Sequence, residues 1–146
     1  MSTKGIKIEK GDQVNPPAFP KFNKVILLDD SDVAFFSCET LLKEVHISKE
    51  IKREISASSV INKLKSSERL SDIPELIFMD INTKKTDGFK FLDEFNNLSD
   101  FVKSKCKIVV LSNNHDLDDK KRILLHPSVI MLLHKPIDAF HLKDLL

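Results

Sequence analysis

Residues 75–80 read ELIFMD, an apolar run that ends in an aspartate. Other short apolar runs bounded by polar residues are KVILL at 24–28, KIVVL at 107–111 and VIMLL at 129–133. Runs of this length without alternation are typical of strands that are buried on both faces, and such strands occur mainly in parallel sheets covered by helices. The four runs therefore predict a parallel sheet, with LIFM and IVVL in its centre.

Helical patterns separate these runs. Apolar residues recur at helical intervals at Val33, Phe36, Leu41 and Val45, and again at Phe89, Leu92 and Phe95. We interpret the helix phenylalanines, which also include Phe35 and Phe91, as core residues. IKREIS at 51–56 alternates apolar and charged residues, which predicts a fifth strand at an edge of the sheet. With a last helix over 139–146, the pattern predicts a doubly wound α/β fold of five parallel strands and five helices.

The N-terminal segment lacks this organisation. MSTKGIKIEKGDQVNPPAFP contains glycines and prolines and shows no sustained period. We predict an N-terminal tail over 1–22 and a single domain over 23–146, which suits a chain of 146 residues. A composition with 41% hydrophobic and 31% charged residues is that of a globular protein.

The charge balance excludes several classes of partner. The chain has 23 Lys and Arg against 22 Asp and Glu, and a net charge of +1 is too small to hold nucleic acid or an acidic membrane. No apolar run approaches the roughly 20 residues of a membrane-spanning helix, and residues 1–10 lack the apolar region of a secretion signal. We therefore expect a cytoplasmic protein that binds neither nucleic acid nor membranes.

Polar residues follow the four apolar runs. They are Asp29 and Asp30 after the first run, Asp80 after the second, Ser112 after the third and, one residue further on, Lys135 after the fourth. In open parallel sheets, functional groups gather beyond the carboxyl ends of the strands. We therefore expect three carboxylates, a hydroxyl and an ammonium group to meet at one edge of the sheet.

This set of groups suits phosphoryl chemistry on a metal ion. Three crowded carboxylates repel one another unless a cation shares the site. Oxygen ligands without His or Cys favour a hard ion, and a site with room for water and phosphate favours Mg²⁺. An ammonium and a hydroxyl group would balance phosphoryl oxygens. Asp80 is then the predicted nucleophile, because carboxylates form acyl phosphates.

The segments VILLDDSD, LIFMDINTKKTDGF, IVVLSNN and LLHKP, in this order, resemble the four signature blocks of response-regulator receiver domains of two-component systems. The resemblance covers about residues 23 to 146. It implies a flavodoxin-like sheet of strand order 2-1-3-4-5. It also implies that Asp30 and Asp80 bind Mg²⁺ directly, that Asp29 acts through water, and that the backbone carbonyl of Asn82 completes the protein ligands.

The resemblance assigns further roles. Ser112 and Lys135 are expected to contact the phosphoryl oxygens, and the Lys135–Pro136 bond is expected to be cis. Gly88, after Asp87, matches an Asp-Gly pair that eases the turn into the third helix. 

Three positions depart from the family pattern. The segment 82–86 lacks the usual proline, and Leu132 stands where relatives carry a switch aromatic, so an aromatic rotamer cannot transmit the signal here. Asn113 stands where relatives often have a small residue. We hypothesise that its side chain narrows access to the acyl phosphate and alters its lifetime.

The function that the resemblance implies is a stand-alone phosphorylatable switch in a phosphorelay. Asp80 would accept a phosphoryl group from a phosphohistidine of a sensor histidine kinase or histidine phosphotransfer protein. The chain would be no enzyme beyond its own phosphoryl transfer and slow autodephosphorylation, and output would come from protein binding through the fourth helix, fifth strand and fifth helix.

Two alternatives belong to other classes. A pseudo-receiver would keep the fold as a binding module without phosphorylation, although Asp30, Asp80, Ser112 and Lys135 argue against it. A phosphatase of the haloacid dehalogenase type also uses an aspartate nucleophile and Mg²⁺. Its nucleophile normally follows the first strand, whereas the first strand here leads to the Asp29–Asp30 pair.

Overall fold

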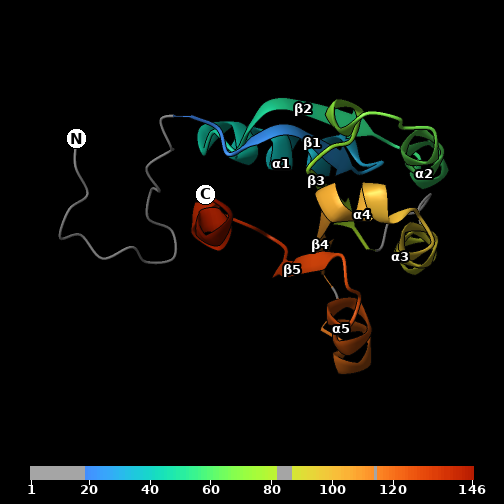
Figure 1. Ribbon diagram of the computed structural model, residues 1–146. Coiled ribbons are helices and arrows are strands. Elements are labelled where there is room, and N and C mark those ends of the chain that lie inside the picture. The colour runs from blue at the N-terminus through green and yellow to red at the C-terminus, as the bar shows by residue number, and fades with distance from the viewer. Residues whose placement is uncertain (1–18, 82–86, 114) are drawn as a thin grey trace.

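A five-stranded parallel sheet forms the centre of the computed structural model, which describes residues 19–81, 87–113 and 115–146. Its strands run in the order β2-β1-β3-β4-β5 (Figure 1). They are β1 (Phe22–Leu28), β2 (Ser48–Glu54), β3 (Leu76–Asp80), β4 (Lys107–Ser112) and β5 (Val129–His134). The predicted doubly wound fold and strand order are confirmed. The edge strand β2 begins and ends earlier than the predicted 51–56.

Helices cover both faces of the sheet. The α-helices are α1 (Asp32–Glu44), α2 (Ala57–Lys65), α3 (Gly88–Asn96), α4 (Asp100–Lys105), α5 (Leu117–Leu124) and α6 (Ala139–Leu142), with 3₁₀ turns η1 (Leu70–Asp72) and η2 (Lys143–Leu145). The described residues thus contain six α-helices instead of the predicted five. The addition is α4, which Ser99 caps and in which Val102 alone is buried. One buried residue gives no helical period that the sequence could reveal.

Alternate residues of the strands pack on opposite faces of the sheet. Val25 and Leu27 of β1 join a core cluster with residues of α1 and α6. Ile26 and Leu28 join the other cluster, which includes residues of α2, α3, α4 and α5. Burial on both faces explains why the sequence of the strand is continuously apolar. It also fixes the carboxyl ends of the central strands in a rigid frame.

The prediction of which α1 residues are buried is wrong in part. Val33 and Phe36 are 79% and 67% exposed, whereas Cys38 and Leu42 are buried. A helix turns about 100° per residue, so Phe36 lies on the side opposite Cys38. The interpretation of the α3 phenylalanines as core residues is confirmed at Phe91 and Phe95, which are fully buried. No helix in the described part of the chain is long and apolar enough to cross a membrane.

Candidate functional site at the carboxyl ends of the strands

Two aspartates end neighbouring strands at the same edge of the sheet. Asp80 is the last residue of β3, and Asp29 follows β1 directly. Leu28 and Met79 are paired in the parallel register, so the aspartates that follow them emerge side by side. Asp29 is 7% exposed and Asp80 is 8% exposed. The site therefore contains two carboxyl groups that are largely removed from water.

Ser112 and Lys135 come to this edge from β4 and from the end of β5. Ser112 is buried and follows Leu111, the register partner of Asp80. The Lys135 backbone N–H donates to the Ser112 carbonyl oxygen at 3.0 Å. The Lys135–Pro136 bond is cis, as expected. The four strands thus bring together residues that are distant in the sequence.

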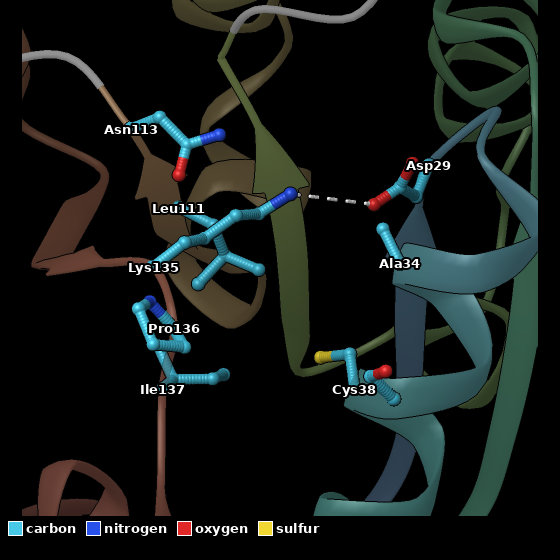
Figure 2. Close-up of a pocket in the computed structure, with 9 residues that line it drawn as sticks. Asp29, Ala34, Cys38, Leu111, Asn113, Lys135, Pro136 and Ile137 are labelled. Carbon is cyan, nitrogen blue, oxygen red and sulfur yellow. Dashed lines mark ion pairs between the residues drawn. The ribbon is translucent and has the colours of Figure 1, made fainter.

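The Lys135 ammonium lies between the two aspartates. Its Nζ forms a hydrogen-bonded ion pair with Asp80 Oδ2 and lies 3.9 Å from Asp29 Oδ2. Figure 2 shows this side chain extended toward Asp29. The structure therefore brings Asp29, Asp80, Ser112 and Lys135 to one edge of the sheet, as predicted, with the two acids and the amine in contact.

The positive charge near the Asp29 carboxyl group does not offset the effect of its burial. Burial raises the pKa of Asp29 above its ordinary value, and the charges of Asp80 and Asp30 raise it further. A hydrogen bond from the Ser31 backbone N–H, at 2.9 Å, and the Lys135 charge lower this pKa but do not cancel the effect. A second cation at this edge would therefore favour the ionised carboxylate.

The donor set fits a hard divalent ion by its chemistry. Asp29 and Asp80 offer carboxylate oxygens, and Asp30, which directly follows Asp29 in the chain, is half-buried. Asn82 lies outside the described residues. Across residues 19–81, 87–113 and 115–146, no three His, Cys, Asp or Glu side chains are grouped closely enough to hold a metal ion. In this arrangement Lys135 supplies the positive charge between the two buried acids.

A cavity of about 360 Å³ opens beside these groups. Figure 2 shows it between α1 and the segment after β5, with Asp29 and Lys135 at one end and the Cys38 thiol in its wall. Burial raises the pKa of Cys38 to about 12, so the thiol stays protonated at neutral pH. No sequence pattern predicted the cavity, which is lined by Asp29, Ala34, Ser37, Cys38, Leu111, Asn113, Lys135, Pro136 and Ile137.

Gly88 is required by a close approach to the residue after Asp80. A Cβ at Gly88 would lie 2.5 Å from the Ile81 carbonyl oxygen and 2.8 Å from Ile81 Cα. Asp87 caps α3 by accepting a hydrogen bond from the Lys90 N–H at 3.1 Å. The Asp-Gly pair therefore has the role expected for it at the start of α3, which is to support the fold.

The family model of the response regulator receiver domain matches residues 25–146. The chain belongs to this family. Its receiver domain is similar to a response regulator from Cytophaga hutchinsonii, with 29% identity over 86% of this chain and 94% of that one and a TM-score of 0.73. It is also similar to a receiver protein from Dyadobacter fermentans DSM 18053, with 27% identity over 84% and 94% and a TM-score of 0.71.

A more distant structure shares only the fold. It is the receiver domain of a sensor histidine kinase from Pseudomonas aeruginosa PAO1, at 16% identity over 84% of this chain and 92% of that one, with a TM-score of 0.64. That protein is described with a magnesium ion coordinated in its active site cleft. A comparison with curated proteins found no match. As a receiver domain, the chain belongs to the signalling proteins of two-component systems.

Proposed function

We propose that this receiver domain is a Mg²⁺-dependent switch that accepts a phosphoryl group on Asp80. One observation carries the proposal: the buried carboxylate of Asp80, the last residue of a central strand, contacts the Lys135 ammonium. The Lys135 backbone N–H also donates a hydrogen bond to the Ser112 carbonyl oxygen. A carboxylate held in this way can attack phosphorus and form an acyl phosphate. Lys135 and the Ser112 hydroxyl would then contact the phosphoryl oxygens.

Asp29, Asp30, Asp80 and the Asn82 carbonyl are the proposed ligands of Mg²⁺. A bound Mg²⁺ would supply positive charge for the phosphoryl oxygens. The raised pKa of Asp29 supports this assignment, because Lys135 and the Ser31 N–H only partly offset the burial of its carboxylate. Because Mg²⁺ would then balance the charge of the acids, the Lys135 ammonium could leave Asp80 and contact the phosphoryl group instead. The domain would catalyse only its own phosphoryl transfer and slow autodephosphorylation.

The proposed phosphodonor is a phosphohistidine on a sensor histidine kinase or a histidine phosphotransfer protein. The exposed Val33 and Phe36 on α1 are suited to contact it, because Ala34 and Ser37 of the same helix line the cavity beside Asp29. Exposed apolar side chains next to a reactive group favour a protein partner at that surface.

We propose that the output surface is formed by α5, β5 and α6. The protein is proposed to act in the cytoplasm. This surface carries four exposed apolar side chains, which are Leu117 and Leu124 of α5, Leu125 directly after α5, and Ile130 of β5. A phosphoryl group on Asp80 would change the contacts of Ser112, which ends β4, and of Lys135, which follows β5, and would thereby affect this surface. Binding of a target protein there would report the phosphorylation state.

The test is incubation of the protein with Mg²⁺ and acetyl phosphate, followed by intact mass measurement. The wild type should gain one phosphoryl group, and Asp80→Asn should gain none. Asp93→Asn is the matched control, because Asp93 is an exposed acid on α3, and it should be phosphorylated like the wild type. Absence of an adduct from acetyl phosphate and from phosphohistidine donors would refute the switch and leave a binding module. Turnover of p-nitrophenyl phosphate would instead indicate a phosphatase.

A further inference from the structure

Arg53 of β2 reaches across the loop that carries the acid pair. Its Nε donates a hydrogen bond to the backbone carbonyl oxygen of Asp29 at 3.2 Å, and its terminal nitrogen donates to Asp32 Oδ1 at 2.7 Å. These two contacts lie on either side of Asp30 in the sequence. A single guanidinium therefore fixes the loop before and after a proposed metal ligand.

Packing holds the guanidinium in this position. Its central carbon lies 4.7 Å from the ring centroid of Phe35, which comes from the first turn of α1. Stacking of this kind restrains the plane of an arginine as well as attracting its charge. The Asp32 side chain is 90% exposed, so its ion pair alone contributes little. The bond to the Asp29 carbonyl and the Phe35 contact are the stronger restraints.

The same loop is also held from the strand backbone. The Asp29 N–H donates to the Glu54 carbonyl oxygen at 3.1 Å, and the Ser31 N–H donates to Asp29 Oδ1 at 2.9 Å. These bonds fix the entry of the loop and the Asp29 carboxylate. Arg53 adds the link from the Asp29 carbonyl to the start of α1. Neither strand periodicity nor the family signature blocks assign a role to a charged residue at this edge position.

We propose that Arg53 is a positioning residue, which holds the backbone around Asp30 so that the Asp29–Asp30 pair is ordered before a divalent cation binds. The inference rests on the proposed Mg²⁺ site. Partners that orient metal ligands typically change affinity by 10–100-fold when they are removed. The fork geometry is essential, because a lysine has one point charge and cannot make both contacts in one plane.

Arg53→Lys tests this idea, since it keeps the charge and removes the fork. Titration of Mg²⁺ by calorimetry should show affinity weakened by about 10-fold. In the metal-free protein, hydrogen exchange of the Asp29 and Ser31 amides should become faster. At saturating Mg²⁺, the rate of phosphorylation by acetyl phosphate should return to the wild-type value, because Arg53 touches no reacting atom.

Arg122→Lys is the matched control. Arg122 also lies over a phenylalanine, 4.1 Å from the Phe89 centroid, and pairs with an acid, Asp93, at 3.7 Å. It should change neither Mg²⁺ affinity nor amide exchange at Asp29. Phe35→Leu, which keeps every charge, should weaken Mg²⁺ binding by less than Arg53→Lys and provides a second variant if that protein does not fold.

Several results would overturn the inference. One is an unchanged Mg²⁺ affinity in both Arg53→Lys and Phe35→Leu. Another is a loss of Mg²⁺ affinity in Arg122→Lys as large as that in Arg53→Lys. A third is a phosphorylation rate of Arg53→Lys that stays low at saturating Mg²⁺. Wild-type protein that binds Mg²⁺ but accepts no phosphoryl group would refute the proposed switch, while the affinities would still decide the role of Arg53. Wild-type protein that binds no Mg²⁺ would refute both.

Discussion

Replacement of Lys135 by methionine should expose the cost of placing two buried acids together. The variant keeps an unbranched side chain that reaches as far as Cε, and it removes the ammonium that Asp29 and Asp80 share. Loss of one partner from a buried ion pair typically costs 3–5 kcal/mol. Lys135 is 20% exposed and Asp29 keeps its bond from Ser31, so we expect the low end, about 3 kcal/mol. For a domain of this size, that corresponds to a fall of roughly 6–12 °C in Tm.

The loss should depend on pH and on Mg²⁺. Burial already holds the pKa of Asp29 above its ordinary value, and removal of the Lys135 charge raises it further. Ionisation of Asp29 therefore costs stability, and this cost disappears as the pH falls through the raised pKa. The penalty of Lys135→Met should thus shrink at acid pH. Mg²⁺ should also stabilise the variant more than the wild type, because the competing ammonium is gone.

Urea unfolding followed by far-UV circular dichroism measures this penalty, with Lys63→Met as the control. Lys63 pairs with Glu54 at 2.7 Å but its side chain is 54% exposed, so its loss should cost at most about 1 kcal/mol. Equal stability of the two variants at neutral pH would refute the reasoning. A Lys135→Met penalty that is the same at every pH and Mg²⁺ concentration would also contradict it.

Three further predictions concern other parts of the fold and the site. Phe95→Ala should lower the free energy of unfolding by about 3–5 kcal/mol, because Phe95 is fully buried. Phe36→Ala should change it by less than about 0.5 kcal/mol, because Phe36 is 67% exposed. Similar losses of the two variants in denaturant unfolding would contradict the assigned face of α1. Gly88→Ala should cost about 1–3 kcal/mol and slow phosphorylation, because its methyl group would press on the Ile81 backbone next to Asp80; a variant with wild-type stability and rate would count against this contact. Asn113→Ala should change the rate of dephosphorylation measured by mass after removal of the phosphodonor, because the exposed Asn113 lines the cavity with Lys135; an unchanged rate would exclude a role for this side chain.

The strands and their terminal residues were predictable because burial on both faces leaves a continuous apolar run. LIFM and IVVL could be read in this way, and parallel topology then places the residues after the runs at one edge. Asp29, Asp80, Ser112 and Lys135 were predicted for this reason, and the structure brings them together. The roles of Asp30 and Asn82 stay predictions.

Other features depend on tertiary packing that a sequence pattern does not encode. The exposed Phe36 lies near the buried Cys38 in the chain, and apolar character alone does not say which of them faces the sheet. The short helix α4 buries a single residue and so has no period. Arg53 appeared in the sequence as a charged residue of an edge strand, and only the fold places it over the Asp29 carbonyl.

Mapping the residue that carries the phosphoryl group tests the central claim most directly. The protein would be phosphorylated by a phosphohistidine donor in the presence of Mg²⁺, the acyl phosphate would be trapped by borohydride reduction, and the peptides would be sequenced by mass spectrometry. We predict modification at Asp80 and nowhere else. Modification of another residue, or a Mg²⁺-bound protein that remains unmodified with every such donor, would contradict the account.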